Sequence, residues 1–254
     1  MDLSGWILRS LSDRFIMPRT FKSCIKLSTL RSNKLNGTIP ATSAKGNYLR
    51  SLNLNDNQLE GSLPRSLINC RRLEVLDLGN NKISGTLPEL RVLVSRSNKF
   101  HGAIASPKTK FSFPNLRIID LSHNEFHGLL PTKYFNHFKA MMGMNANNGK
   151  LKYMGESYYH DSVMVTMKGF YIEMVKIQNL FTTIDFSNNI IKGEIPKSIG
   201  MLKSLKGLNF SHNNLIGHMP PTLGNLSNHE WLDLSSNMVI GEIPRQQILH
   251  ILKF

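Results

Sequence analysis

The chain has few of the features that mark disulfide-rich or membrane-spanning proteins. Its 254 residues include only 2 cysteines, Cys24 and Cys70, and contain no apolar run long enough for a transmembrane helix. Two cysteines are too few for a disulfide framework, and a spanning helix needs about 20 consecutive apolar residues. We therefore expect no disulfide scaffold and no transmembrane segment in this chain.

A recognisable secretion signal is also missing. The apolar run in MDLSGWILRSLSDRFIMPRTFKS is interrupted by Arg9, Asp13 and Arg14 before it reaches the length of a signal-peptide core. We interpret residues 1–24 as a degenerate repeat or an N-terminal remnant, with Trp6 at the position of an asparagine that recurs later in the chain.

Catalytic and metal-binding motifs are likewise missing. The sequence has no phosphate-binding loop, nucleophile elbow or Cys/His cluster, and the glutamate of HNEFH, residues 123–127, stands in the wrong place for a zinc-binding helix. We expect a protein that is not an enzyme and that uses no metal or cofactor.

The net charge of +14 comes from lysines and arginines that are dispersed along the chain. Because no nucleic-acid motif accompanies them, we expect no nucleic-acid partner. The same charge would favour a polyanionic partner such as cell-wall pectin.

What the chain does contain is a repeat. LNLNDNQLEGSLP, LDLGNNKISGTLP, IDLSHNEFHGLLP, IDFSNNIIKGEIP, LNFSHNNLIGHMP and LDLSSNMVIGEIP all follow the pattern L-x-L-x-x-N-x-L-x-G-x-I-P, and LSTLRSNKLNGTIP and LVSRSNKFHGAIA are weaker copies. The copies are centred on Asn33, Asn57, Asn81, Asn98, Asn124, Asn189, Asn213 and Asn237. Several neighbouring asparagines are 24 residues apart, a period typical of leucine-rich repeats.

This pattern predicts a β/α solenoid. A single L-x-L strand cannot bury its apolar side alone, whereas stacked copies form a parallel sheet over a continuous core. The recurring asparagine is expected to turn inward and bond backbone groups that the tight corner leaves unpaired. We predict a right-handed superhelix with the parallel sheet on its concave face and short 3-10 or helical turns on its convex side.

The repeats divide the chain into segments. We predict five copies over residues 25–138, a non-repeat island over 139–180, and three copies without a terminal cap over 181–254. One copy, at 82–98, is shortened, because Asn98 follows Asn81 by 17 positions, and Ser95 stands there at an inward leucine position. Loss of a core leucine is destabilising, so we expect this layer to be the weakest of the stack.

Two features of these repeats resemble a known family. The version with L-x-G-x-I-P after the asparagine looks like the plant-specific class of leucine-rich repeat. The segment YYHDSVMVTMKGFYIEMVKIQNLFTTIDFSNNIIKGEIPKSIGMLKSLKGLNFSHNNLIGHMPPTLGNLSNHEWLDLSSN is similar to the membrane-proximal region of plant receptor-like proteins, which are cell-surface receptors without a kinase domain.

The resemblance implies a non-enzymatic recognition module on the extracellular side of the plasma membrane. Such receptors bind a peptide, a protein or a microbial elicitor and signal through adaptor and co-receptor kinases. They normally also carry a signal peptide, terminal caps and a transmembrane helix, so the resemblance implies a receptor truncated at both ends. Two alternatives are a wall protein similar to polygalacturonase inhibitors, which lack an island, and a non-functional receptor remnant.

The island has two parts. MGMNANNGKLKYMGES is rich in glycine and asparagine and predicts a mobile loop, whereas DSVMVTMKGFYIEMVKI alternates apolar residues and predicts a hairpin that turns at Lys168-Gly169. Either the island's tyrosines only pack it onto the solenoid, or the island contributes to ligand contact. Its candidate ligand-binding residues are Tyr153, Tyr158, Tyr159, His160 and Lys168.

The other candidates come from the concave face. Residues that flank the inward positions of each strand point to that side. They give the candidates Arg117, Asp120, His123, Lys206, His212 and Trp231, and we expect the Trp231 indole to be exposed for partner recognition. N-glycosylation sequons begin at Asn36, Asn209 and Asn225.

Overall fold

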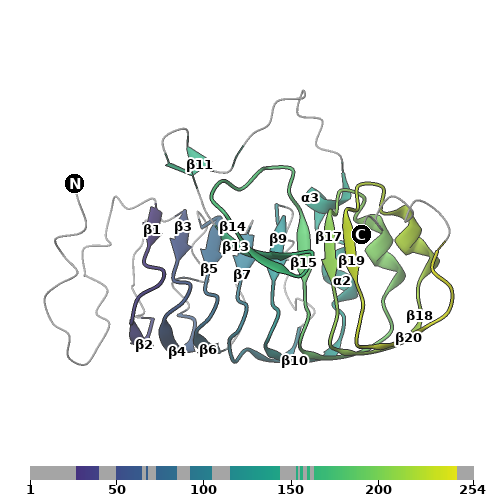
Figure 1. Cartoon of the computed structure of the whole chain (residues 1–254), viewed down its shortest axis with the longest axis horizontal. Helices are drawn as coiled ribbons and strands as arrows, with labels where there is room; N and C mark the ends of the chain where they lie inside the picture. The colour runs from purple at the N-terminus through teal and green to yellow at the C-terminus, as the bar shows by residue number, and fades with distance from the viewer. Residues whose placement is uncertain are drawn as a thin grey trace, which may run out of the picture.

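The computed structural model describes residues 27–39, 50–64, 67, 73–84, 92–104, 115–143, 153, 155–156, 159–160 and 163–244. Within these residues the chain forms a solenoid whose repeats stack side by side along the long axis (Figure 1). The predicted leucine-rich-repeat architecture is confirmed.

The long sheet of the solenoid is parallel and takes one strand from each repeat. Its order is β1 (Leu27–Thr29), β3 (Ser51–Asn53), β5 (Val75–Asp77), β7 (Val92–Val94), β9 (Ile118–Asp120), β15 (Thr183–Asp185), β17 (Gly207–Asn209) and β19 (Trp231–Asp233). β9 pairs directly with β15, Ile119 opposite Ile184, although the island separates them in sequence. The repeats therefore stack across the island without a gap in the sheet.

Short strands also pair on the opposite edge of the solenoid, low in Figure 1, and this pairing was not predicted from the sequence. One sheet contains β2 (Asn36–Thr38), β4 (Gln58–Ser62) and β6 (Lys82–Ser84); the other contains β8 (His101–Ala103), β10 (Glu125–Leu129), β16 (Ile190–Gly193), β18 (Asn214–His218) and β20 (Met238–Ile240). Gly193 has φ +85°, and a Cβ there would lie 2.5 Å from Cδ2 of Leu129. The recurring glycine thus gives space for a side chain of the preceding repeat.

Short helices connect these edges. They are α2 (Thr132–Phe135) and α3 (Lys139–Met142), with the 3-10 helices η2 (Lys197–Met201) and η3 (Pro221–Asn225) in the later repeats. The predicted 3-10 turns are therefore present. α3 packs into the core through the buried side chain of Met141, and the amide of Ser204 donates to the Met141 carbonyl over 2.8 Å. The start of the predicted island is thus part of the solenoid's packing.

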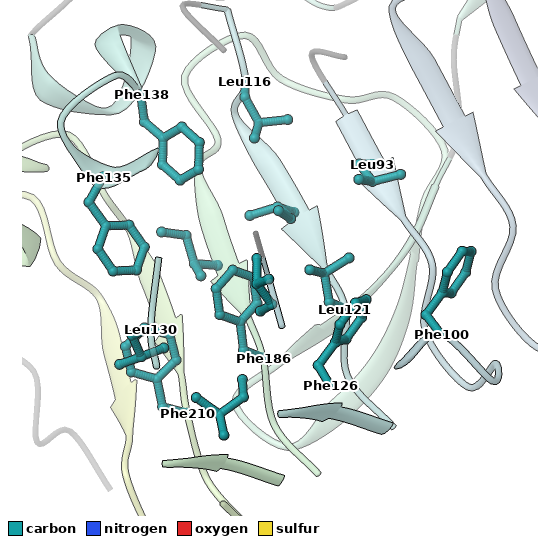
Figure 2. Close-up of a cluster of buried hydrophobic side chains, with 14 of the residues drawn as sticks. Leu93, Phe100, Leu116, Leu121, Phe126, Leu130, Phe135, Phe138, Phe186 and Phe210 are labelled. Carbon is teal, nitrogen blue, oxygen red and sulfur yellow. The ribbon is translucent and has the colours of Figure 1, made fainter. Parts of the chain in front are cut away.

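Leucine, isoleucine and phenylalanine side chains fill the space between the edges. Figure 2 shows phenyl rings from successive repeats lying within one cluster. The Phe186 and Phe210 rings have centroids 5.7 Å apart, and those of Phe100 and Phe126 are 6.2 Å apart. Stacked rings of this kind add to the area-dependent stabilisation of each layer.

The recurring asparagine bonds backbone groups at the corner, as predicted, and it also joins neighbouring repeats. Asn213 Nδ2 donates to the carbonyl oxygens of Phe186, Phe210 and Ser211 at 2.9, 3.2 and 3.1 Å, and its Oδ1 accepts from the amide of Ile191 at 3.0 Å. The residue before it, His212, has φ +52°, so the chain turns sharply there. One side chain therefore satisfies buried backbone groups of two repeats.

Replacing Asn213 by alanine should lower the free energy of unfolding by about 3 kcal/mol, because a buried amide and carbonyls lose their partner. Asn214→Ala is the matched control, since Asn214 is exposed, and it should change stability by no more than about 0.5 kcal/mol. Denaturant unfolding measures both variants. Equal losses in the two would show that the asparagine is not a specific link between repeats.

The shortened repeat keeps its place in the sheet. Val92 of β7 pairs with Val75 on one side and Ile118 on the other. Ser95 is fully buried at the inward position, and its Oγ finds no hydrogen-bond partner among the described residues. The predicted substitution of a core leucine by a buried hydroxyl is therefore present, while residues 85–91 lie outside the described part of the chain.

A second polar residue replaces a core leucine near β19. His229 stands 24 residues after Leu205, is 9% exposed, and has Nδ1 at 3.3 Å from the Leu205 carbonyl oxygen. Burial lowers the pKa of the His229 imidazole from 6.5 to about 4. In the unfolded chain the His229 imidazole takes up a proton below about pH 6.5, whereas in the folded chain it stays neutral until about pH 4. Stability associated with His229 is therefore lost as the pH falls across this window.

His229→Leu should stabilise the chain more at pH 5 than at pH 7.5, with a difference of about 2 kcal/mol. His218→Leu is the control because His218 is exposed on β18. Thermal or urea unfolding at both pH values measures the effect. A gain for His229→Leu that is the same at both pH values would contradict a buried neutral imidazole.

Candidate recognition surface

The face of the long sheet that points away from the core, called the open face below, is partly covered by the island. The predicted hairpin is present as β13 (Val163–Met167) and β14 (Phe170–Met174), with Lys168 and Gly169 both at positive φ in its turn. A shorter pair, β11 (Gly155–Glu156) and β12 (Tyr159–His160), precedes it. Figure 1 shows β13 and β14 crossing in front of the middle strands of the sheet.

Apolar residues hold this hairpin on the sheet. Val163, Val165, Ile177 and Phe181 form one buried cluster with open-face residues of three neighbouring strands, which are Val75, Val92, Val94 and Ile118. The island's packing thus depends mainly on aliphatic residues rather than on the tyrosines considered in the sequence analysis. This contact could have been predicted from the sequence. Aliphatic residues stand on the open face of β5, β7 and β9, at the position where β3 carries Ser51 and β15 carries Thr183.

Polar side chains add ties between the hairpin and the corners of the repeats. Glu173 forms an ion pair with Arg31, and Arg96 donates to Thr166 and lies 4.6 Å from the centroid of the Tyr171 ring. The Tyr171 hydroxyl lies 3.5 Å from Asn55 Nδ2 and accepts from Asn80 Nδ2 at 3.3 Å. Of these residues, Tyr171 belongs to the island tyrosines considered from the sequence; its partners were not predicted, because each interaction joins segments that are far apart in the chain.

Buried carboxyl groups lie on the open face close to this contact. Asp120 and Asp185 are opposite each other on β9 and β15, and each is at most 2% exposed. Burial, and then the negative charge of Asp120, raises the pKa of Asp185 to about 7; burial also raises the pKa of Asp120, and that of Asp77 to about 6. The described residues contain no group of acidic, histidine or cysteine side chains that could hold a metal ion.

Asp185→Asn should stabilise the protein at pH 8, by about 2 kcal/mol, and have little effect at pH 4. The pKa of the Asp185 carboxyl group is higher in the folded chain, about 7, than in the unfolded chain, about 3.8. The contribution of Asp185 to stability is therefore fully present below about pH 3.8 and is lost as the pH rises through about 7. Asp233→Asn is the matched control: Asp233 accepts the same bonds from Ser235 but is only half-buried. Urea unfolding across this pH range measures both, and a pH-independent gain for Asp185→Asn would contradict the assignment.

The candidates of the open face occupy different environments. Arg117 is half-buried, Asp120 is buried, and the exposed side chains His123 and His212 occupy corner positions with positive φ. Burial, followed by the positive charges of Arg96 and His212, lowers the pKa of His123. Lys206 forms an ion pair with Glu230 on the neighbouring repeat.

The expectation that Trp231 is exposed is wrong. Its side chain is buried, with 7% of the residue exposed, and it lies over Gly207 of the preceding strand, where a Cβ would be 2.3 Å from the indole ring. A glycine on the open face creates space that the neighbouring indole fills. Trp231 is therefore a packing residue of the sheet surface in this structure.

The island candidates are only partly described. Tyr153 is 38% exposed, with Lys176 Nζ 5.9 Å from its ring centroid, and Lys168 is exposed at the hairpin turn. Tyr159 and His160 lie in β12, and Tyr158, like most of the predicted mobile loop, lies outside the described residues.

The three sequons also differ in accessibility. Asn36 and Asn225 are exposed, whereas Asn209 is buried. The Asn209 amide accepts from Ser211 over 3.0 Å and donates to Asp185 over 3.3 Å. A glycan on Asn209 would require these bonds to break, so the expectation that this sequon is a usable site is at odds with the structure.

Comparison with known proteins agrees with this architecture. Two leucine-rich-repeat family models match the chain, one over residues 16–83 and the other over 115–136, 181–202 and 204–226. The chain belongs to the leucine-rich-repeat family. Among the described residues, no helix is long and apolar enough to cross a membrane.

Its relatives are receptor-like proteins of plants. Receptor-like protein 33 of Arabidopsis thaliana is 46% identical over 194 residues, which cover 73% of this chain and 22% of the relative. Receptor-like protein 18 of the same species is 48% identical over 119 residues, or 46% of this chain and 14% of the relative. The resemblance to receptor-like proteins is confirmed, and the chain spans less than a quarter of either relative.

Solved structures of plant receptor ectodomains share the fold. The Arabidopsis receptor kinase HAESA, in complex with the peptide hormone IDA and the co-receptor SERK1, matches with a TM-score of 0.66 and 28% identity, over 90% of this chain and 32% of that chain. The ectodomain of the Arabidopsis thaliana receptor kinase GASSHO1/SCHENGEN3, in complex with CASPARIAN STRIP INTEGRITY FACTOR 2, gives a TM-score of 0.64 and 29% identity, over 85% and 22%. These likenesses point to a receptor ectodomain fold and give no support for pectin as a partner.

Proposed function

We propose that this leucine-rich-repeat segment forms part of the extracellular recognition region of a plant receptor-like protein. The observation that carries the proposal is its identity of 46% to Receptor-like protein 33 over 73% of the chain. The structures of HAESA with a peptide hormone and of GASSHO1/SCHENGEN3 with its factor support a peptide or protein as the ligand class. The proposed segment acts at the outer side of the plasma membrane and has no catalytic role.

The ligand surface that we propose lies on the open face beyond the hairpin, over β15, β17 and β19. There the exposed or half-exposed groups include His212, Lys206 and Glu230, whereas the hairpin already covers the sheet around Val92 and Ile118. Cationic and anionic groups side by side suit a polar peptide or a microbial elicitor protein. Signalling would pass to adaptor and co-receptor kinases, with glycans on Asn36 and Asn225.

A peptide-binding experiment tests this function. The purified chain is used to select binders from a random peptide library, and selected peptides are measured against a double variant, Lys206→Glu with His212→Ala. We expect at least about tenfold weaker binding by this variant, because both groups face the proposed ligand.

The matched control is Lys192→Glu with His218→Ala, which makes the same changes at exposed positions on the opposite edge of the solenoid. This variant should bind the selected peptides as the parent chain does. A library that yields no binder, or an equal loss in both double variants, would refute the proposed surface.

A further inference from the structure

The shortened repeat differs from the others in its length and at one inward position. Only 17 positions separate Asn98 from Asn81, so the segment that returns from one sheet edge to the other is shorter than in the repeats of 24 residues. Its inward position holds Ser95 in place of a leucine, with an unsatisfied hydroxyl among the described residues. Both defects reduce the apolar contact that normally holds a layer between its neighbours.

The open-face side of this same repeat is unusually well held. Its three alternate side chains all contact the island hairpin: Val92 and Val94 belong to the buried cluster with Val163 and Val165, and Arg96 binds Thr166 and lies on the Tyr171 ring. The hairpin thus contacts this repeat at Val92 and Val94 of β7 and at Arg96, which lies two residues beyond the end of β7.

The hairpin also reaches repeats on both sides of the shortened one. Towards the N-terminus, Glu173 pairs with Arg31 and Tyr171 accepts from Asn80. Towards the C-terminus, the apolar cluster includes Ile118 of β9 and Phe181, which stands two residues before β15. A two-stranded element therefore spans the shortened repeat and contacts the repeats before and after it.

We infer that the hairpin of residues 163–174 is an internal clamp that keeps the shortened repeat in register. The clamp supplies apolar and polar contacts on the open face of a repeat that is seven residues short in sequence and that carries Ser95 at an inward leucine position. This inference concerns the stability of the chain and does not rest on the proposed receptor function. The hairpin is then a fixed part of the scaffold and not a flap that moves freely off the sheet.

Hydrogen exchange of two hairpin variants tests the clamp. Val165 and Ile172 are opposite each other in the hairpin, but Val165 is 1% exposed against the sheet and Ile172 is 37% exposed. Val165→Asp would place a carboxylate in the apolar cluster and detach the hairpin, whereas Ile172→Asp makes the same change where water reaches it.

In Val165→Asp, the amides of residues 92–98 should exchange at least about tenfold faster, because local opening of that layer becomes easier. In Ile172→Asp, they should exchange at the parent rate, and residues 207–213 should be unchanged in both. Unchanged exchange at 92–98 in Val165→Asp would show that the hairpin is dispensable. Equal acceleration at 207–213 would show general destabilisation rather than a clamp on one repeat.

A milder pair of variants covers the case in which Val165→Asp does not fold. Arg96→Gln removes the guanidinium group that joins the shortened repeat to Thr166 and Tyr171, whereas Arg31→Gln removes the hairpin's tie to the first described repeat. We expect faster exchange at residues 92–98 in Arg96→Gln than in Arg31→Gln. The opposite order, or no change in either, would overturn the assignment.

Discussion

The hydrogen bonds of the recurring asparagine set the geometry on which the other layers depend. From Asn57 to Asn237 each such side chain reaches back one repeat; Asn237, for example, donates to the Phe210 carbonyl and accepts from the Leu215 amide. This places buried backbone groups of adjacent turns at a fixed separation, and the leucine and phenylalanine layers can then pack at regular spacing. The long sheet, its neighbouring edge strands and the aromatic core all follow from that spacing.

Most of the scaffold could be predicted from the sequence, because its interactions recur with the repeat. Position within the motif predicted the inward leucines and the role of Asn213. It also predicted that the Ser95 hydroxyl would stand at a buried leucine position. The second set of strands was missed, since a glycine and proline motif gives no direct sign of pairing between equivalent segments. The hairpin turn at Lys168-Gly169 was readable because both residues fit a tight reversal.

The open face was harder to predict, because exposure there depends on what else covers it. Trp231 was expected to reach a partner, but the absence of a side chain on Gly207 allows the indole to lie flat on the sheet. Asp120 was expected to face a ligand, but it is buried beside Asp185. Neither outcome follows from the alternation of a strand, since both depend on a neighbour in another repeat.

The shortened repeat shows where this architecture tolerates a change of length. Asn98 still donates to the Leu78 carbonyl and accepts from the Ile83 amide, although its repeat is seven residues shorter than a 24-residue one. The links made by the recurring asparagine run along the strand edge and the corner, while the seven missing residues belong to the return segment. Length variation within a gene for such a chain can therefore accumulate on the return side without shifting the phase of the solenoid, whereas an insertion between a strand and its asparagine would interrupt it.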